Sequence, residues 1–253
     1  VFKAIMDLGV HHIDPDYRHL FDGHNEQSSE IIFSRKYLEN EVSNNLQLVI
    51  RPNVDGGWHW LNPFQNFLDA YLCVDGKSIW ESDLYDPQNP IIKDGVEYRD
   101  PRLYYTVYYP AISIINGMKY HGHPDSTSTG DEFGEDPGMT GYCLRKYVDE
   151  EYTGDVYNGG SDVPIVRYAE VLLSYLECKI KNNDPITQDL LDQTINQIRT
   201  RESVDMPAVT ETDRNQLWEI LMLERRIELA WEGLRFWDLV RWGEIDDVLN
   251  GPF

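Results

Sequence analysis

Cysteine is scarce in this sequence, and its scarcity excludes several kinds of site. Only three cysteines, Cys73, Cys143 and Cys178, occur among the 253 residues. Their odd number and wide spacing allow one disulfide at most, and the missing C-x-x-C pair argues against a structural zinc site. We therefore expect three buried thiols. The sequence also has no run of about 18 apolar residues, so we expect no membrane-spanning helix.

Basic residues are half as numerous as acidic ones. The chain has 22 Lys and Arg against 44 Asp and Glu, which gives a net charge of −22. Such a field repels nucleic-acid backbones and anionic membrane surfaces, whereas neutral ligands such as sugars are unaffected. The first residues, VFKAIMDLGVHHIDPDY, lack the basic start, apolar core and cleavage site of a signal peptide. They look like the continuation of a helix, and we expect the chain to be a piece of a larger protein.

Catalytic signatures are missing as well. The sequence contains no G-x-S-x-G, no Walker loop, no G-x-G-x-x-G and no H-E-x-x-H. With 44 carboxylates, some acidic pair always lies at a glycosidase-like distance, and nothing in the sequence singles one out. We therefore expect a protein that is not an enzyme.

Two kinds of potential metal ligand, histidines and acidic residues, cluster in the sequence. Histidines gather at positions 11, 12, 19 and 24 and again at 121 and 123, but neither group has the spacing of a zinc site. The oxygen-rich stretch from Asp14 fails the EF-hand pattern, because its sixth and twelfth positions are His19 and Asn25. A calcium ion held by Asp131 to Asp136 is a minor alternative to a solvated acidic loop. We expect no cofactor.

The densest mixture of apolar, aromatic and charged residues lies between Asp213 and Gly243. Apolar residues recur there at helical spacing, Asp213 can cap the start, and Gly243 lies where a stop is expected. We predict one long, buried helix whose charges must be paired, because an isolated buried charge is very costly. Glu228 and Glu232 are one turn apart, with Arg225 and Arg235 three residues to either side. The residues expected to form structural ion pairs are Arg225, Arg226, Glu228, Glu232, Arg235 and Asp238.

Local patterns predict the remaining elements. Residues 164–181 and 187–200 are predicted to form an antiparallel helical hairpin of tetratricopeptide type. Asn62 is predicted to cap a short helix with Pro63 as its first residue. The other predicted elements are a helix end at 1–9 stopped by Gly9, the helix itself at 64–71, and strands at 29–37 and 103–109.

A glycine-flanked loop, GGWHW at 56–60, is the sharpest candidate for ligand binding. Sugar rings stack their C–H faces on aromatic planes while their hydroxyls need polar partners. Trp58 and Trp60 supply the planes, and His59 and Asn53 supply polar groups. The alternative is that one or both tryptophans pack under the loop as local core. Weaker candidates are Trp80 and the tyrosines at 104, 105, 108 and 109, of which strand alternation buries about half.

Seven stretches resemble, in the right order, the SusD/RagB family of nutrient-binding lipoproteins. The strongest is ERRIELAWEGLRFWDLVRWG at 224–243, which is similar to the C-terminal signature of that family. Phe64 stands where the family usually has Thr, and Leu176 and Cys178 replace Ala. The other stretches are SEIIF (29–33), NPFQNFLDAYLCVDGK (62–77), YRDPRLYY (98–105), GYCLRKYV (141–148), residues 163–177 and TINQIRTR (194–201).

The resemblance implies a fold and a role. It implies a mostly α, SusD-like fold with tetratricopeptide-type helical hairpins, long ordered loops and small β-strands. Residues 1–160 would form a loop-rich, ligand-facing region and residues 161–253 a helical region of the same domain. Such proteins are lipid-anchored on the outer face of the outer membrane. They capture oligosaccharides without cleaving them and deliver them to a SusC-type TonB-dependent transporter.

Two other roles stay open within the same family. One is capture of peptides, in which loop backbone groups dominate over tryptophan faces. The other is a lid that gates the transporter without setting specificity. The family's N-terminal half, its lipid-anchor cysteine and its closing segment have no counterpart in the sequence.

Overall fold

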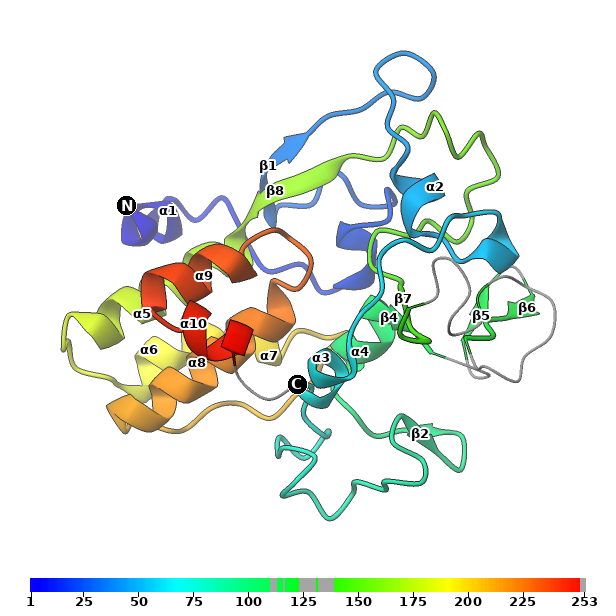
Figure 1. The fold of residues 1–253 in the computed structure, drawn as a ribbon. Coiled ribbons are helices and arrows are strands. Elements are labelled where there is room, and N and C mark those ends of the chain that lie inside the picture. Colours follow the sequence, from blue (N-terminus) through cyan, green and yellow to red (C-terminus); the bar gives the residue numbers. More distant parts are fainter. Residues whose placement is uncertain (110–112, 116, 123–130, 132–138, 251–253) are drawn as a thin grey trace.

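The chain is mostly helical, with short strands between long connections (Figure 1). The computed structural model describes residues 1–109, 113–115, 117–122, 131 and 139–250. The helices are α1 (Phe2–Leu8), α2 (Leu46–Ile50), α3 (Gln65–Asp69), α4 (Pro101–Thr106), α5 (Tyr168–Lys181), α6 (Gln188–Asp192), α7 (Ile195–Arg199), α8 (Arg214–Glu228), α9 (Arg235–Trp242) and α10 (Ile245–Asn250). This confirms the predicted fold class.

The strands form antiparallel pairs only, within the described residues. The longest pair joins β1 to β8 and has irregular register near Phe33. The other pairs are β2 with β3, β4 with β7, and β5 with β6. The strands are β1 (Ile31–Arg35), β2 (Ile92–Lys93), β3 (Val96–Glu97), β4 (Val107–Tyr108), β5 (Ile114–Ile115), β6 (Met118–Lys119), β7 (Cys143–Leu144) and β8 (Val163–Arg167).

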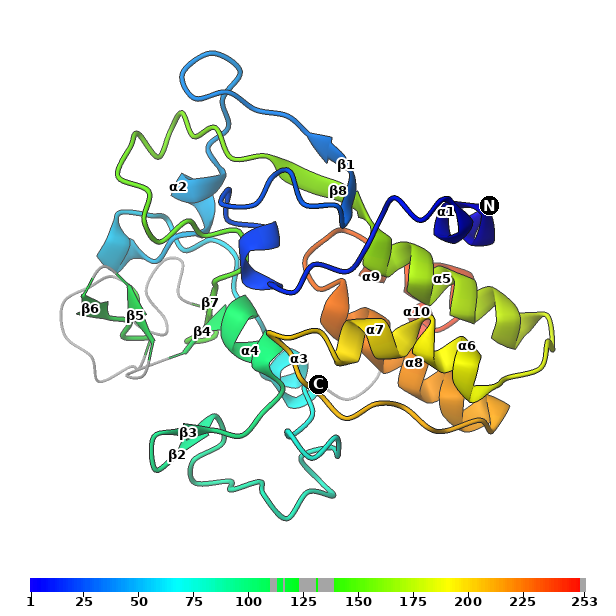
Figure 2. The same cartoon turned by 180° about the vertical axis from the view of Figure 1, so that it is seen from behind.

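Helices α5 to α10 gather at one end of the molecule, and the loop-rich region occupies the other (Figures 1 and 2). The helical end is built around buried aliphatic side chains of α5, α7 and α8, such as Leu172, Ile198 and Leu221. A second core, around Tyr17, Phe21 and Tyr108, lies under the loops. Among the described residues, no helix has the length and apolar character needed to cross a bilayer.

The predicted long helix between Asp213 and Gly243 is wrong in one respect, because it is two helices. Asp213 does cap α8, accepting hydrogen bonds from the N–H groups of Asn215 and Gln216. However, α8 ends at Glu228, and α9 begins at Arg235. Trp231 and Gly233 between them have φ of 63° and 80°, which no right-handed helix accommodates. The turn folds α9 back so that Asp238 meets Arg225.

The strand predicted for 103–109 is also wrong over most of its length. The Asp100 carboxylate accepts a hydrogen bond from the Arg102 N–H, and Pro101 occupies the first helical turn. These two features start a helix, and α4 therefore replaces the strand up to Thr106. Only Val107 and Tyr108 are extended.

Other boundaries shift for local reasons. The first helix of the predicted hairpin starts at Tyr168, because residues 163–167 pair with β1 instead. Its second helix is interrupted at residues 193 and 194, between α6 and α7. Phe64, not Asn62, is the N-cap of α3. The strand at 31–35, the helix stopped by Gly9 and the helix within 64–71 are confirmed.

The three thiols do not share one environment. Cys73 and Cys143 are buried, as predicted, but Cys178 is exposed. It lies on α5 next to the buried pair Leu176 and Glu177, at a position where the helix turns toward solvent. The prediction of three buried thiols is therefore wrong for Cys178.

Candidate ligand-binding site

The loop from Arg51 to Trp60 is held in a single shape by its own backbone. The N–H groups of Trp58 and Trp60 donate to the carbonyls of Leu48 (2.7 Å) and Val49 (3.0 Å) in α2. Gly57 packs so closely on Arg51 that a Cβ there would overlap the Arg51 carbonyl oxygen. Gly57 is therefore required at this position, and the loop doubles back on α2.

His59 points into the protein, between two tryptophans that point out. Its φ is 52°, and its ring is fully buried. The ring Nε2 lies 3.1 Å from both the Tyr142 carbonyl oxygen and the Tyr120 hydroxyl, and Nδ1 lies 3.1 Å from Asp131. The role of ligand contact proposed for His59 is therefore wrong. The left-handed backbone turns its ring inward, where it supports the loop.

Asp131 supports the same loop from below. Its buried carboxylate accepts the backbone N–H groups of Asn53 (2.7 Å) and Val54 (2.8 Å) as well as lying beside His59. These bonds place Asn53 at the base of the loop, where its backbone fixes the loop to Asp131. The half-buried Asn53 stays a candidate for ligand contact at the loop edge.

Trp58 and Trp60 form an exposed pair of rings. Their centroids lie 4.7 Å apart with an interplanar angle of 35°, and 37% and 56% of the two residues is exposed. Tyr157, itself 57% exposed, approaches Trp58 edge-on at 6.3 Å. We call these three residues, Trp58, Trp60 and Tyr157, the aromatic platform. The sequence did not single out Tyr157, because nothing local to it indicates that it meets the loop at 51–60.

The platform combines the two properties that sugar recognition needs. Exposed indole faces offer apolar area for the C–H faces of a pyranose ring, while the Trp Nε1 and the Tyr hydroxyl can bond to hydroxyl groups. Rings held by backbone bonds on a rigid loop lose little conformational freedom on binding. The arrangement suits adhesion to a ligand.

Trp80 and the tyrosines of 104–109 lie elsewhere. Trp80 is 83% exposed, but its loop between α3 and β2 projects at the end of the molecule opposite α2 (Figures 1 and 2). Tyr104, Tyr108 and Tyr109 are buried, and Tyr105 is half-buried against the core around Tyr17. These tyrosines therefore belong to the interior.

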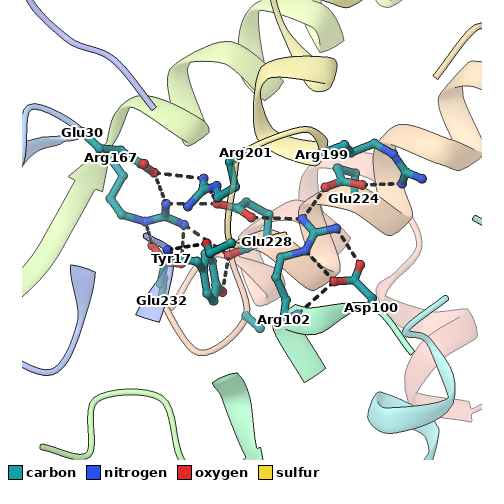
Figure 3. Close-up of polar contacts among 12 residues, drawn as sticks. Tyr17, Glu30, Asp100, Arg102, Arg167, Arg199, Arg201, Glu224, Glu228 and Glu232 are labelled. Atoms are coloured by element: carbon teal, nitrogen blue, oxygen red, sulfur yellow. Dashed lines mark hydrogen bonds and ion pairs between the residues drawn. The ribbon is translucent and has the colours of Figure 1, made fainter. Parts of the chain in front are cut away.

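The charged residues of α8 and its turn form a buried ion-pair lattice (Figure 3). The Glu228 carboxylate lies 3.0, 3.1 and 2.9 Å from the guanidinium groups of Arg102, Arg167 and Arg201. Glu232 pairs with Arg167 and Lys146. The lattice continues through Glu30, Asp100, Arg199 and Glu224. Arg225 pairs separately with Asp238 through two bonds of 2.8 and 2.9 Å.

Arg226 and Arg235 depart from the predicted pairing. Arg226 donates to the Asn66 carbonyl (3.0 Å), and Arg235 lies over the Trp242 ring at 6.0 Å. Neither is within ion-pair distance of a carboxylate in the described part of the chain. Both side chains instead line a groove of about 770 Å³, together with Phe64, Trp231 and Phe236.

The lattice shifts the pKa values of its members in ways that fit a structural role. Burial raises the pKa of Glu228, but the charges of Arg201, Arg167 and Arg102 outweigh burial, and the net pKa lies below its ordinary value. Burial lowers the pKa of Lys146 to about 8, against the raising effect of Glu232. Each charged member of the lattice lies beside an opposite charge.

The candidate metal ligands are used otherwise. His19 bonds to Asp22 and His24 to Asp149, at 2.9 and 3.0 Å. Over the described ranges, no group of three or more His, Cys, Asp and Glu side chains is arranged to hold a metal ion. His123 lies outside the described residues. So do the acidic residues at 132–136, which belong to the proposed calcium site.

Comparisons with known proteins agree with this architecture. A SusD-like carbohydrate binding protein from Bacteroides fragilis has a TM-score of 0.90 and 41% identity, over 98% of this chain and 48% of its own. A surface glycan-binding protein A from Bacteroides fluxus has the same fold, with a TM-score of 0.67 and 23% identity, over 99% of this chain and 48% of its own. The chain thus spans about half the length of these solved relatives.

Sequence comparison leads to the same group. The SusD-like protein P38 from Formosa agariphila is 33% identical over 101 residues, which are 36% of this chain and 19% of that protein. The model of the SusD family matches residues 29–253, a range that includes α2 with its loop, α4, and all of the helical end. The chain therefore belongs to the SusD family.

Proposed function

We propose that this chain captures a glycan on the aromatic platform without cleaving it, as the surface-binding component of an outer-membrane uptake system. The observation that carries the proposal is the exposed Trp58–Trp60 pair, held outward by backbone bonds while His59 holds the loop inward. A core position would explain neither the exposure of both rings nor their shared orientation. The names of the solved relatives, a carbohydrate binding protein and a glycan-binding protein, support the same role.

Delivery is the second part of the proposal. The captured glycan passes to a SusC-type TonB-dependent transporter in the outer membrane, and the full-length protein is lipid-anchored on the extracellular face. The support here is membership of the SusD family. Co-purification of the tagged protein with such a transporter from detergent-solubilised membranes tests this part separately from glycan binding.

Binding by the platform is tested with single substitutions. We expect Trp58→Ala and Trp60→Ala each to weaken retention of the bound glycan about 5–10-fold, the loss of one stacked ring. Trp80→Ala is the matched control, because Trp80 is exposed and belongs to the loop between α3 and β2, which projects at the end of the molecule opposite α2, and it should leave retention unchanged. Equal losses in all three variants would contradict the proposal.

Two further outcomes separate the alternative roles. Retention of oligopeptides but of no sugar would favour peptide capture. Unchanged glycan retention in both tryptophan variants, with transporter association intact, would favour a lid that does not set specificity. Chromatography of the recovered glycan should show it intact, and any cleavage product that depends on the protein would contradict passive capture.

A further inference from the structure

We infer that the aromatic platform selects uncharged glycans and excludes uronic-acid and sulfated ones; this rests on the proposed function, because it names the ligand class of the same site. The inference follows from the charges of the two chain segments that surround the platform. Residues 38–62 carry Trp58 and Trp60, and residues 149–162 carry Tyr157. We call these two segments the platform rim.

The two segments form one surface. The Asn44 N–H donates to the Gly159 carbonyl (2.9 Å), and the Asn40 N–H donates to the Asn158 carbonyl (3.3 Å). The Tyr152 hydroxyl donates to the Glu39 carboxylate at 3.0 Å. With Tyr157 set against Trp58, these contacts hold the two segments side by side at the platform.

The rim is almost entirely acidic. Residues 38–62 contain three carboxylates and one arginine, and residues 149–162 contain five carboxylates and neither lysine nor arginine. The single arginine, Arg51, is buried; its guanidinium pairs with Asp55 (3.1 Å) and donates to the carbonyls of Asp149 and Tyr152. The rim therefore offers no exposed Lys or Arg that could bind an anionic group on a ligand.

Some rim carboxylates are paired with basic side chains from outside the rim, and others are not. Lys36 pairs with Asp162, His24 with Asp149, and Arg145 with Glu150. The remaining four are exposed and have no ion-pair partner in the described part of the chain: Glu39, Glu41, Glu151 and Asp155.

Asp155 lies beside the platform itself. Its carboxylate accepts the backbone N–H of Tyr157 at 2.9 Å and the side-chain amide of Asn158 at 2.7 Å. The Asn158 amide and the Tyr157 N–H lower the pKa of Asp155, so it is ionised at neutral pH. A carboxylate or sulfate on a sugar stacked against the platform would be repelled by this charge, two residues from Tyr157, and salt screens such repulsion over a Debye length of roughly 8 Å.

The physical consequence is discrimination by charge. Neutral hydroxyls can donate hydrogen bonds to the rim carboxylates, whereas a uronate or sulfate brings a like charge to a surface on which Glu39, Glu41, Glu151 and Asp155 have no ion-pair partner within the described ranges. At low salt, we expect a neutral oligosaccharide to be retained at least about tenfold more strongly than an anionic derivative of the same backbone. The difference should shrink as salt screens the surface.

The experiment uses oligosaccharides in matched pairs on one array, probed with the full-length protein. The pairs are xylo-oligosaccharides with and without glucuronic acid branches, galactan oligosaccharides with and without sulfate, and dextran against dextran sulfate. Retention is counted as platform binding only where Trp58→Ala weakens it about fivefold or more. We expect such retention to be confined to the neutral members.

Two double variants test the cause. Glu39→Gln with Asp155→Asn keeps both hydrogen-bond acceptors and removes both charges, and it should raise retention of anionic members several-fold. Glu202→Gln with Glu219→Gln removes two exposed charges from the helical end, and it should change nothing. Trp58-dependent retention of anionic members at least equal to that of neutral ones would overturn this inference while supporting the proposed function. Absence of any Trp58-dependent retention would overturn the proposed function, and this inference with it.

Discussion

Glu228 shows how much of this structure depends on single charged side chains. It is fully buried, and three arginines from α4, the end of β8 and the segment after α7 converge on it. Taking these ions out of water is costly, and the lattice is stable only because each charge is matched. The residues concerned come from widely separated parts of the sequence, so the lattice joins the loop-rich region to the helical end.

Replacement of Glu228 by glutamine should therefore destabilise the protein strongly. Glu228→Gln keeps the shape but leaves Arg102, Arg167 and Arg201 without this charge, and we expect the free energy of unfolding to fall by about 3–5 kcal/mol. Urea unfolding followed by circular dichroism measures the change. Glu202→Gln, at an exposed position, is the control and should cost less than about 0.5 kcal/mol. A loss below about 1 kcal/mol at Glu228 would contradict a structural role for the lattice.

Lys146 makes the unfolding free energy of the protein depend on pH in the alkaline range. Burial lowers its pKa to about 8 in the folded protein, whereas its ordinary value is 10.5. Between these values the unfolded chain holds a proton that the folded protein has lost, so this residue makes stability rise with pH from about 8 to 10.5. The difference in unfolding free energy between wild type and Lys146→Met should grow in favour of wild type across this range. A constant or falling difference would show that Lys146 keeps its proton.

At the scale of elements, the loop between α2 and Trp60 depends on one glycine more than on its neighbour. Gly57→Ala places a Cβ against the Arg51 carbonyl, so the loop must move and the tryptophan pair must separate. Gly56→Ala meets open space, and its positive φ alone should cost about 1–2 kcal/mol. We expect Gly57→Ala to remove the exciton signal of the pair in circular dichroism and to abolish glycan retention. Gly56→Ala should keep both, and equal behaviour of the two variants would contradict the close approach.

Some elements could be predicted from the sequence because their signals are local. Gly9 ends α1, alternation marks β1, and Asp213 caps α8. The tyrosine-rich stretch at 103–109 was predicted as a strand because its composition favours one, but the Asp-Pro start of α4 outweighed that composition. The break after α8 depends on a positive φ at Trp231, which helical periodicity does not reveal.

The residues of the candidate site likewise include some that local sequence predicts and some that only the fold brings together. Trp58 and Trp60 were predicted from glycines that adjoin them in the sequence. Tyr157 and Asp131 reach the loop only through the tertiary fold, as does the inward turn of His59. The family resemblance supplied the fold class, but no local pattern indicates which distant residues meet.

At the scale of the whole molecule, the ion-pair lattice and the aromatic platform are built from different residues. The ion-pair lattice ties Glu30 and Arg102 of the loop-rich region to Arg167 and Glu228 of residues 161–253. We propose that this lattice fixes the scaffold on which the aromatic platform stands and so reduces the entropic cost of glycan binding. We propose that the loop-rich region, 1–160, faces the ligand and that 161–253 holds it in place.

The measurement that tests glycan capture most directly is a fluorine NMR titration of the protein labelled with 5-fluorotryptophan. The seven tryptophans should give seven resonances, which Trp58→Phe and Trp60→Phe assign to the platform. We predict that a retained glycan shifts the resonances of Trp58 and Trp60 and leaves those of Trp80 and Trp231 in place. A glycan that binds while shifting Trp80 or Trp231, and neither platform resonance, would contradict the account.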